Sequence, residues 1–405
     1  MRLLTAKRAL VIGGSMSGLL AALALRRRGW HVEVFERVAE PLAGRGAGIV
    51  AQPELKTALR ALGLNPDSDL GVEVPTRIMY AGDGRVTHKV LWSQTMTAWD
   101  RVFHLLQSEL PEANYHRGKE LRHVEQRNGV VAHFADGSVA EGDILVGGDG
   151  IRSTVRQQYL PELVPPYAGY VAWRGMIPEA AFPPALHAEL FEDFSFCLPP
   201  SEQALGYPVA GPDNDLRPGH RRYNLVWYRP ASEERELPWL LTDDTGRTHA
   251  LSIPPPLIAH AVVAAMRAAA RELLAPQFND VIGLCEQPFL QPIYDLEVPH
   301  MAFGRVAVLG DAAFVARPHV GAGVAKAAED ALALADALDA ESDVETALKR
   351  FEAVRLPVGN KIIARARRLG AYVQADLKTQ EERVYAALHR KPEAVLAETA
   401  TMDFL

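Results

Sequence analysis

The sequence predicts an α/β fold in which a domain with a parallel sheet is interrupted by a mostly-β region and followed by C-terminal helices. Three observations predict it. A strand, a glycine-rich turn and a helix follow one another in residues 9–37, and this pattern returns in 143–156 and 305–338. Between residues 167 and 293 the chain instead has strand-like segments joined by proline-rich connections. The third observation is an alternating segment, 72–90, with a hairpin turn at 81–84.

Residues 9–37 have the pattern of a Rossmann-like βαβ unit, which binds dinucleotides. We expect a buried strand over residues 9–12, a helix over 19–28 and a second strand over 31–35. Gly29 ends the helix. A tight turn that binds nothing is the alternative, and the flanking strands, helix and acid disfavour it.

Small residues follow the first strand at the spacing that lets backbone approach a pyrophosphate. Gly13 permits the tight turn, Ser15 is nearly as small as the usual glycine, and Gly18 lets the helix pack on the strand. The helix N-terminus favours the anion. Glu36 would hold the adenosine ribose, and an acid there suits FAD or NAD better than a 2′-phosphate. The contacts expected from this unit are Gly13, Gly14, Ser15, Met16, Gly18, Glu36 and Arg37.

Length and composition limit the class of protein. The 405 residues suffice for two or three domains, and the net charge of −7 argues against nucleic acid or an anionic membrane as partner. No apolar run approaches the roughly 18 residues of a membrane span, and no signal peptide is recognised. The only cysteines, Cys197 and Cys285, predict no disulfide framework. We expect a cytoplasmic monomer or homodimer.

The domain organisation follows from these patterns. We expect the dinucleotide-binding domain to be discontinuous and the β region to be inserted in it. The expected parts are 1–71, 91–166 and 294–345 for the first domain, 72–90 and 167–293 for the inserted domain, and 346–405 for the C-terminal helices. The segment 41–52 is rich in small residues, so its backbone is expected near a ligand, with Val50 and Gln52 as contacts. No ligand spacing predicts a metal site.

Three separated segments resemble the single-component flavoprotein aromatic hydroxylases. They are GGSMSG with Glu36, GGDGIRSTVR from Gly147 and GDAAFVARPHVGAGVAKAAEDALALADAL from Gly310. The resemblance implies bound FAD and a fold like that of p-hydroxybenzoate hydroxylase. It places Asp149 in a motif associated with both FAD and the nicotinamide nucleotide. The remaining implied cofactor contacts are Gly310 and Asp311 at ribose and phosphate, and Pro318, Gly321, Ala322 and Gly323 in the loop over the flavin ring.

Shorter segments resemble one branch of this family, whose members hydroxylate dihydroxypyridines. These segments are GIVAQPEL, TAWD, YAGYVAWRG, YPVAG and ARPHVGAG. The branches that act on urate and 6-hydroxynicotinate resemble the chain less closely. Asp100 and Phe314 stand where many members carry arginine and histidine, and both departures argue against the commonest phenol hydroxylases.

The resemblance implies an FAD-dependent monooxygenase that uses NADH or NADPH as a transient co-substrate. In this family reduced flavin and O2 form a flavin 4a-hydroperoxide, which gives an oxygen atom to an electron-rich ring. We therefore expect a small aromatic substrate, a hydroxylated N-heteroaromatic ring similar to dihydroxypyridine. Two alternatives remain: an FAD oxidase or dehydrogenase without oxygen insertion, and a non-catalytic FAD-binding redox sensor.

Deprotonation of a ring hydroxyl makes the ring richer in electrons, so a base with a pKa near neutral is useful. His319 is the first candidate because it precedes the flavin loop; a hydrogen bond to loop backbone is the alternative. Gln203 and Tyr207 share a face of an expected strand, and Tyr207 either bonds a ring oxygen or packs in the core. Weaker candidates on the next strand are Asn224 and Trp227, whereas Trp173 and Arg174 are expected to be structural, with an acid as a possible partner of Arg174.

Overall fold

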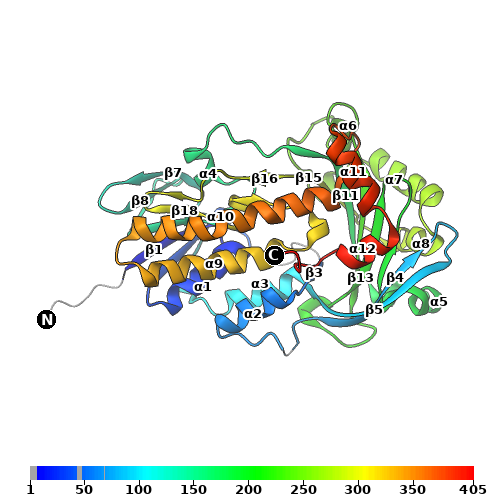
Figure 1. Ribbon diagram of the computed structural model, residues 1–405, viewed down its shortest axis with the longest axis horizontal. Helices are drawn as coiled ribbons and strands as arrows, with labels where there is room; N and C mark the ends of the chain where they lie inside the picture. Colours follow the sequence, from blue (N-terminus) through cyan, green and yellow to red (C-terminus); the bar gives the residue numbers. More distant parts are fainter. Residues whose placement is uncertain (1–6, 43–47, 68) are drawn as a thin grey trace.

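In the computed structural model, which describes residues 7–42, 48–67 and 69–405, two large sheets lie along the long axis of the molecule (Figure 1). The first has the order β17-β18-β10-β1-β2-β6 and is parallel from β18 to β6. Its strands are β1 (Arg8–Ile12), β2 (His31–Glu36), β6 (Tyr115–Arg117), β10 (Ile144–Gly147), β17 (Ala302–Phe303) and β18 (Val306–Val308).

Helices cover this sheet as the apolar strands require, because parallel strands are buried on both faces. Helix α1 (Met16–Arg27) follows β1, and α9 (Gly323–Ala340) packs against it. The long α10 (Val344–Leu369) lies beside α9, in orange and gold in Figure 1. The predicted strands and helices of this domain are confirmed, and α1 begins three residues before the predicted Leu19.

The second sheet has eight strands in the order β15-β11-β14-β13-β12-β4-β5-β3. Its members are β3 (Gly48–Val50), β4 (Val72–Tyr80), β5 (Val86–Ala98), β11 (Tyr167–Pro178), β12 (Phe194–Cys197), β13 (Gln203–Val209), β14 (Arg222–Pro230) and β15 (Phe289–Tyr294). The predicted hairpin is present, but β5 continues to Ala98, so the boundary expected at residue 90 lies inside a strand. The extension has partner strands throughout, because β4 pairs with β5 as far as Met96 and β3 pairs with Met96 to Ala98.

The two faces of this sheet have different partners. One face packs on α7 (His260–Leu273) and α8 (Pro276–Leu284), at the right of Figure 1, and its core includes Val171 and Trp173. The other face contributes Tyr170 and Ala172 to a second core, which also contains residues of the C-terminal segment. Along β11, β13 and β14, residues alternate between the two cores, as the pleat of a sheet requires.

Smaller elements complete the chain. A three-stranded sheet contains β7 (Leu121–Gln126), β8 (Val130–Phe134) and β9 (Val139–Gly142), and β16 (Leu296–Glu297) pairs with β19 (Phe314–Val315). The other α-helices of the described residues are α2 (Pro53–Ala61), α3 (Trp99–Gln107), α4 (Thr154–Tyr159), α5 (Pro184–Leu186), α6 (Glu236–Leu240), α11 (Gln380–His389) and α12 (Pro392–Glu398).

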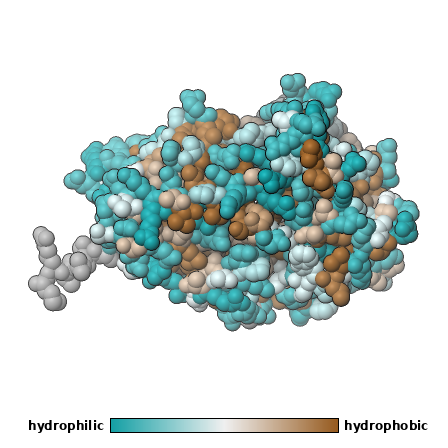
Figure 2. Space-filling view, viewed as in Figure 1, coloured by the Kyte–Doolittle hydropathy of each residue, from teal (hydrophilic) through white to brown (hydrophobic). Residues whose placement is uncertain are grey.

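Figure 2 shows a face on which hydrophobic residues lie in small groups among hydrophilic ones. Within residues 7–42, 48–67 and 69–405, none of the helices combines the length and apolar character needed to cross a bilayer.

Gly359 of α10 tests how tightly the helices pack on the first domain. A Cβ at Gly359 would lie 2.3 Å from Cε2 of Phe314, whose ring is fully buried. Alanine is a better helix former by about 1 kcal/mol, but overpacking a core costs about 1–3 kcal/mol. We expect Gly359→Ala to lower the free energy of unfolding by about 1 kcal/mol or more in urea titrations.

The matched control is Gly283→Ala in α8, where a Cβ would meet nothing within 4 Å. This variant should be as stable as the parent or up to about 1 kcal/mol more stable. Equal effects of the two substitutions would show that helix propensity, and not the Phe314 contact, sets the response.

Candidate active site

A cavity of about 720 Å³ lies at the carboxyl ends of β1, β2 and β10. Open parallel sheets bind ligands at this edge, and the volume is typical of a cofactor site. Eight of the expected cofactor contacts line it: Gly13, Ser15, Met16, Glu36, Arg37, Asp149, Asp311 and Gly323. Gln291 and Tyr294 of β15 form part of the opposite wall, so the cavity lies between the two large sheets.

The turn after β1 has no room for side chains. A Cβ on Gly18 would lie 1.8 Å from the Gly13 carbonyl oxygen, and one on Gly13 would lie 2.5 Å from the Gly148 carbonyl oxygen. Gly13 also has a φ of +100°, which L-residues rarely adopt. The side chain of Ser15, the N-cap of α1, makes no capping hydrogen bond. The first N–H groups of α1 are therefore available to an anion in the cavity.

Glu36 is held rigidly at the cavity wall, where it is 6% exposed. Its carboxylate accepts hydrogen bonds from the N–H groups of Gly14, at 2.8 Å, and Val38, at 2.9 Å. The Tyr115 hydroxyl donates to the Gly14 carbonyl at 2.8 Å, which fixes the turn from behind. Each carboxylate oxygen keeps lone pairs that ribose hydroxyls can use.

Asp149 lines the cavity, but its carboxylate is already used within the protein. It accepts hydrogen bonds from the Ser153 hydroxyl and from the backbone N–H groups of Thr154 and Val155. Burial raises the pKa of Asp149, and these hydrogen bonds oppose the rise. Asp149 thus orders the start of α4. The backbone of Gly148 and Gly150 lines the cavity beside it.

The Gly310 turn supplies a carboxylate on another wall. Gly310 has a φ of +60°, and its N–H group donates to the buried Asp330 at 3.1 Å. Asp311 reaches the cavity from this turn. The surrounding protein atoms raise the pKa of Asp311; Lys326 opposes this rise and Asp330 adds to it.

The loop from Pro318 to Gly323 leads from β19, in the two-stranded sheet, to the start of α9. Gly321 has a φ of +63°, and Gln52 donates a hydrogen bond from Nε2 to the Val320 carbonyl at 3.3 Å. The backbone N–H of Ala400 donates to the His319 carbonyl at 2.8 Å. The expected contacts Val50, Gln52, Pro318, Gly321 and Ala322 belong to this loop or to the β3 segment next to it, of which residues 43–47 lie outside the described residues.

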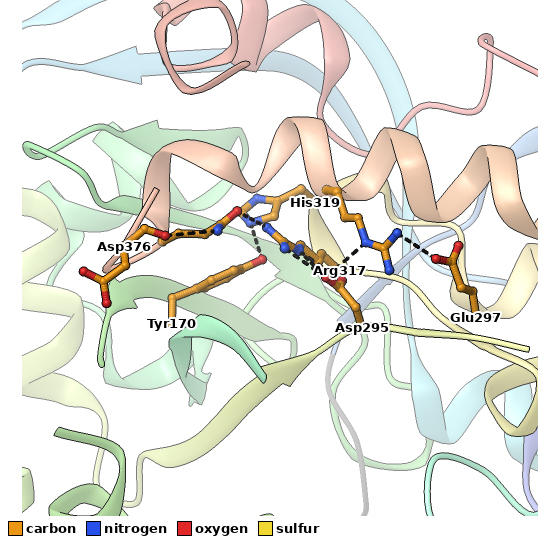
Figure 3. Close-up of polar contacts among 8 residues, drawn as sticks. Tyr170, Asp295, Glu297, Arg317, His319 and Asp376 are labelled. Atoms are coloured by element: carbon orange, nitrogen blue, oxygen red, sulfur yellow. Dashed lines mark hydrogen bonds and ion pairs between the residues drawn. The ribbon is translucent and has the colours of Figure 1, made fainter. Parts of the chain in front are cut away.

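His319 is 2% exposed and both of its ring nitrogens are engaged. Figure 3 shows the contact with Tyr170. Nδ1 lies 2.9 Å from Oε1 of Gln203, and Nε2 lies 3.1 Å from the Tyr170 hydroxyl. Because an amide oxygen only accepts, Nδ1 carries the proton, and Nε2 accepts from Tyr170. The Tyr228 ring centroid lies 4.3 Å from that of His319.

Burial lowers the pKa of His319 to about 3, and the charge of Arg317 adds to this fall. The near-neutral pKa expected for a base at this position is therefore wrong. The expectation rested on the motif, and the motif does not reveal that Tyr170, Gln203 and Tyr228 enclose the ring. A base works best with a pKa near the working pH.

Arg317 anchors the loop next to His319 (Figure 3). Its Nε and one terminal nitrogen donate to the carboxylate of Asp295, and its other terminal nitrogen donates to Oε1 of Gln374 at 2.7 Å. Arg367 of α10 donates to Asp295 and also to Glu297. The loop is therefore tied both to the end of β15 and to the C-terminal segment.

Gln203 and Tyr207 lie on the same face of β13, as predicted, and this face contains the second core. Tyr207 is 5% exposed, and burial raises the pKa of its hydroxyl. Asn224 lies opposite Tyr207 on β14 and accepts a hydrogen bond from the Gly48 N–H at 3.0 Å. Trp227 was expected near the substrate, but it packs on the helix-covered face and donates to Glu202. Trp227 lies three residues after Asn224, and strand residues separated by an odd number point to opposite faces of the sheet.

Several buried polar atoms near the loop have no hydrogen-bond partner among the described residues. They are Nε2 of Gln203, Nδ2 of Asn224, Oε1 of Gln52 and the hydroxyl of Tyr372. Buried polar groups are normally satisfied, so such a group points to a missing partner. The sequence pattern alone brought only Gln203, Asn224 and Gln52 to notice.

Other residues of the site were not among the predicted contacts, although Trp99, Arg152 and Tyr170 stand inside the segments TAWD, GGDGIRSTVR and YAGYVAWRG. Trp99, Lys119 and Arg152 line the cavity, and Tyr170 and Tyr228 enclose His319. Tyr170 and Tyr228 belong to strands, where aromatic residues usually pack in cores, so no signal separated them from other strand aromatics. Arg317 stands in the quoted segment ARPHVGAG beside Pro318, but no feature of the sequence pointed to its buried partner Asp295.

Two groups of side chains in the described part of the chain could approach a metal ion: His123, Glu125 and His133, and Glu179, His187 and Glu192. None of the six lines the cavity. In the second group, Arg221 already pairs with both carboxylates.

Comparison with known proteins identifies related sequences. The model of a family described as FAD binding domain matches residues 7–180 and 293–366, and one described as FAD binding domain-like matches 167–295. The chain is 33% identical over 374 residues to 2,6-dihydroxypyridine 3-monooxygenase of Paenarthrobacter nicotinovorans, covering 91% of this chain and 92% of the relative.

Solved structures agree with these matches. The structure of 2,6-dihydroxypyridine-3-hydroxylase from Arthrobacter nicotinovorans superposes with a TM-score of 0.85 at 30% identity, covering 93% of this chain and 96% of that one. Klebsiella pneumoniae HpxO, solved with FAD and uric acid, gives a TM-score of 0.74 at 22% identity, covering 97% of each chain, and shares the fold.

The residues present fit FAD. A Cβ at Gly13 or Gly18 would clash with protein backbone, so glycine at these positions permits the tight turn through which backbone can approach a pyrophosphate. The uncapped start of α1 offers N–H groups to its charge, and Glu36 offers acceptors to a ribose. Unpartnered Oε1 of Gln52, beside the Pro318–Gly323 loop, is a further polar group that a bound ring could satisfy.

Glu36→Gln should weaken FAD binding by about 10- to 100-fold, because a charged hydrogen bond contributes about 1.5–3 kcal/mol. The measurement is titration of FAD-free protein with FAD, followed by flavin fluorescence. Glu33→Gln is the control, because Glu33 lies on the same strand but does not line the cavity. Unchanged affinity in Glu36→Gln would mean that Glu36 does not contact the ribose.

The low pKa of His319 predicts acid sensitivity. Its pKa is about 3 in the folded protein and about 6.5 when unfolded, so below pH 6.5 the unfolded chain binds the extra proton. Stability is therefore lost as the pH falls from 6.5 toward 3. Between pH 7 and pH 5 the parent should lose about 2 kcal/mol more than His319→Asn in urea unfolding.

The exposed His104 on α3 provides the control for replacing a histidine, since His104→Asn leaves the buried cluster intact. An NMR titration of the His319 ring gives a direct check. A native imidazole that titrates near pH 6.5 would contradict the burial argument.

Proposed function

The chain belongs to the FAD binding domain family of flavoprotein aromatic hydroxylases, and from this premise we propose that it hydroxylates an N-heteroaromatic ring that carries hydroxyl groups. The protein is an FAD-dependent aromatic monooxygenase. Its substrate ring, its use of NADH or NADPH and its individual site residues belong to the proposal.

One observation carries the choice of a polar heterocycle. Beside the expected flavin loop, the amides of Gln203 and Asn224 each have a buried NH2 group without a partner among the described residues. Leaving such a donor unsatisfied costs about 1–3 kcal/mol, so a substrate with acceptor oxygens or ring nitrogens gains where a plain hydrocarbon ring does not. The similarity to 2,6-dihydroxypyridine 3-monooxygenase supports the same class of ring.

The proposed reaction balances with one dioxygen molecule. Ring C–H, O2, NAD(P)H and a proton give ring C–OH, water and NAD(P)+. Bound FAD supplies the redox chemistry, accepting hydride from the nicotinamide and activating dioxygen. The protein binds and orients the ring, excludes water and adjusts the charges around it.

The side chains divide this work. Gln203 and Asn224 donate hydrogen bonds to ring oxygens through their free NH2 groups, and the Tyr207 hydroxyl, four residues after Gln203 on β13 and opposite Asn224, contacts the same ring. Burial keeps Tyr207 protonated, so its hydroxyl can donate to an oxygen anion. These residues hold the ring against the flavin loop, which is the orientation that hydroxylation requires.

His319 acts in this proposal as a neutral positioning residue. Its Nδ1–H group donates to Oε1 of Gln203, which turns the Gln203 NH2 group away from the imidazole. Its Nε2 accepts from Tyr170, which fixes the tautomer. With a pKa of about 3, the imidazole keeps this role throughout the neutral range.

The test is a panel of 2,6-dihydroxypyridine, 6-hydroxynicotinate, urate and phenol with the FAD-loaded protein. NADH and NADPH oxidation are followed under 18O2, and the product masses are measured by mass spectrometry. We expect dihydroxypyridine or hydroxynicotinate to gain one labelled oxygen atom. In the same assay Gln203→Leu should raise KM at least tenfold, because it removes the free donor.

Hydroxylation of phenol alone would contradict the proposed heterocyclic substrate and would leave the assignment as a monooxygenase intact. Substrate oxidation without labelled oxygen would favour an oxidase or dehydrogenase. No NAD(P)H oxidation with any ring would favour a redox sensor.

A further inference from the structure

Arg174 lies on the face of the eight-stranded sheet that contains Gln203 and Tyr207. Along β11, Tyr170 and Ala172 belong to the core on this face, and Val171 and Trp173 belong to the helix-covered core. The alternation puts Arg174 with Tyr170 and Ala172. Its charge acts on the hydroxyls of Tyr207 and Tyr228, whose pKa values burial raises and Arg174 lowers.

The strand register gives this face the layout of a small platform. Arg174 lies beside Val226 of β14, and Val226 lies beside Leu205 of β13. On the same face, the next pair toward one end of the strands is Tyr228 with Gln203. The next pair toward the other end is Asn224 with Tyr207. Strands are about 4.8 Å apart and alternate residues about 7 Å apart, so the apolar centre has the size of one aromatic ring.

Polar groups therefore surround an apolar floor, and Arg174 is the only charged side chain among these platform positions. Val226 and Leu205 are 3% and 5% exposed, so the platform is covered. His319 contacts it at Gln203 and β3 contacts it at Asn224, through Gly48.

Arg174 has no counter-ion within residues 7–42, 48–67 and 69–405. The other arginines there that are not exposed each donate to a carbonyl, amide or carboxylate oxygen or pair with an acid, as Arg221 and Arg317 do. Arg174 has no hydrogen bond or ion pair to a described residue, and its Nε is buried without a partner. A partly buried guanidinium in this state is strongly stabilised by an anionic oxygen.

We propose, on the basis of the proposed function, that Arg174 binds an anionic oxygen of the substrate and so selects rings that enter the site already ionised. The oxygen belongs either to a ring hydroxyl that has lost its proton or to a carboxylate on the ring. An ionised ring is richer in electrons, and the guanidinium stabilises that state without removing a proton. The neutral imidazole of His319 then needs no exchange of protons with the substrate.

The experiment compares Arg174→Gln and Arg174→Lys with the parent as FAD-loaded proteins. Binding of 2,6-dihydroxypyridine and of 6-hydroxynicotinate is measured without NAD(P)H, from the change in flavin absorbance, and KM and kcat are measured separately. We expect Arg174→Gln to raise both Kd and KM about 10- to 100-fold, because a charge-assisted hydrogen bond is lost. Arg174→Lys keeps the charge but not the planar guanidinium, so its Kd and KM should lie between those of the parent and those of Arg174→Gln.

The two probes distinguish the source of the anion. A loss with 6-hydroxynicotinate alone assigns Arg174 to the carboxylate, and a loss with both rings assigns it to the ionised ring oxygen. In the second case, binding of 2,6-dihydroxypyridine to the parent strengthens with pH through the ring's own ionisation, and Arg174→Gln loses this dependence.

Arg229→Gln is the matched control, because Arg229 belongs to the same sheet, pairs with Glu202 and is absent from the platform. Its Kd values should stay within about twofold of the parent. FAD content and melting curves monitor folding. If Arg174→Gln loses FAD, the binding test uses Arg174→Lys in its place. If the parent hydroxylates these rings and both Arg174 variants bind them as tightly, the inference is overturned and the proposed function stands. If the parent does not turn them over, the proposed function fails first.

Discussion

The buried ion pair between Arg317 and Asp295 holds the two halves of the site together. Asp295 follows β15 at the edge of the eight-stranded sheet, whereas Arg317 begins the loop that leads to α9. Both side chains are nearly inaccessible, so removing one partner would leave a buried charge, at a cost of about 3–5 kcal/mol. The pair also brings in Gln374 and Arg367, and through them the C-terminal segment supports the loop. The position of His319 follows from this anchoring.

The elements of the cofactor half could be predicted because their requirements are local. A strand, a turn without side chains and a helix occur within 30 consecutive residues, and Gly13 and Gly18 are needed by backbone contacts inside that unit. The substrate half depends on contacts between distant segments. Gln203 and His319 are 116 residues apart, and no period in the sequence links them. For the same reason, Trp227 was expected near the site, whereas the structure places Tyr228 beside His319. Only the register of β14 decides which of these two neighbouring aromatic residues faces the loop.

Burial, which a sequence motif does not report, also decides the chemistry available to each ionisable group. The motif around His319 suggests a base, but enclosure by Tyr170, Gln203 and Tyr228 stabilises the neutral ring. Arg174 shows the converse. A strand arginine is expected to be structural, yet the described residues give it no acid, and its charge is directed at two tyrosines on the platform. The site therefore combines a neutral imidazole with a fixed positive charge, which is suited to stabilising an anion and poorly suited to creating one.

This division also explains how one cofactor scaffold can serve different rings. The cavity, the glycine turns and Glu36 meet a ligand that does not change, so their geometry is constrained by backbone contacts. In the proposed site, the platform would meet the ring only through side chains on alternate positions of three strands, and each can change without altering the ladder of hydrogen bonds beneath it. A change at Arg174, Gln203 or Tyr207 would alter charge or hydrogen bonding at one edge of the ring and leave the sheet intact. Specificity for the ring and binding of the cofactor are thus separable within one continuous chain, and the loop held by Arg317 is where they must stay aligned.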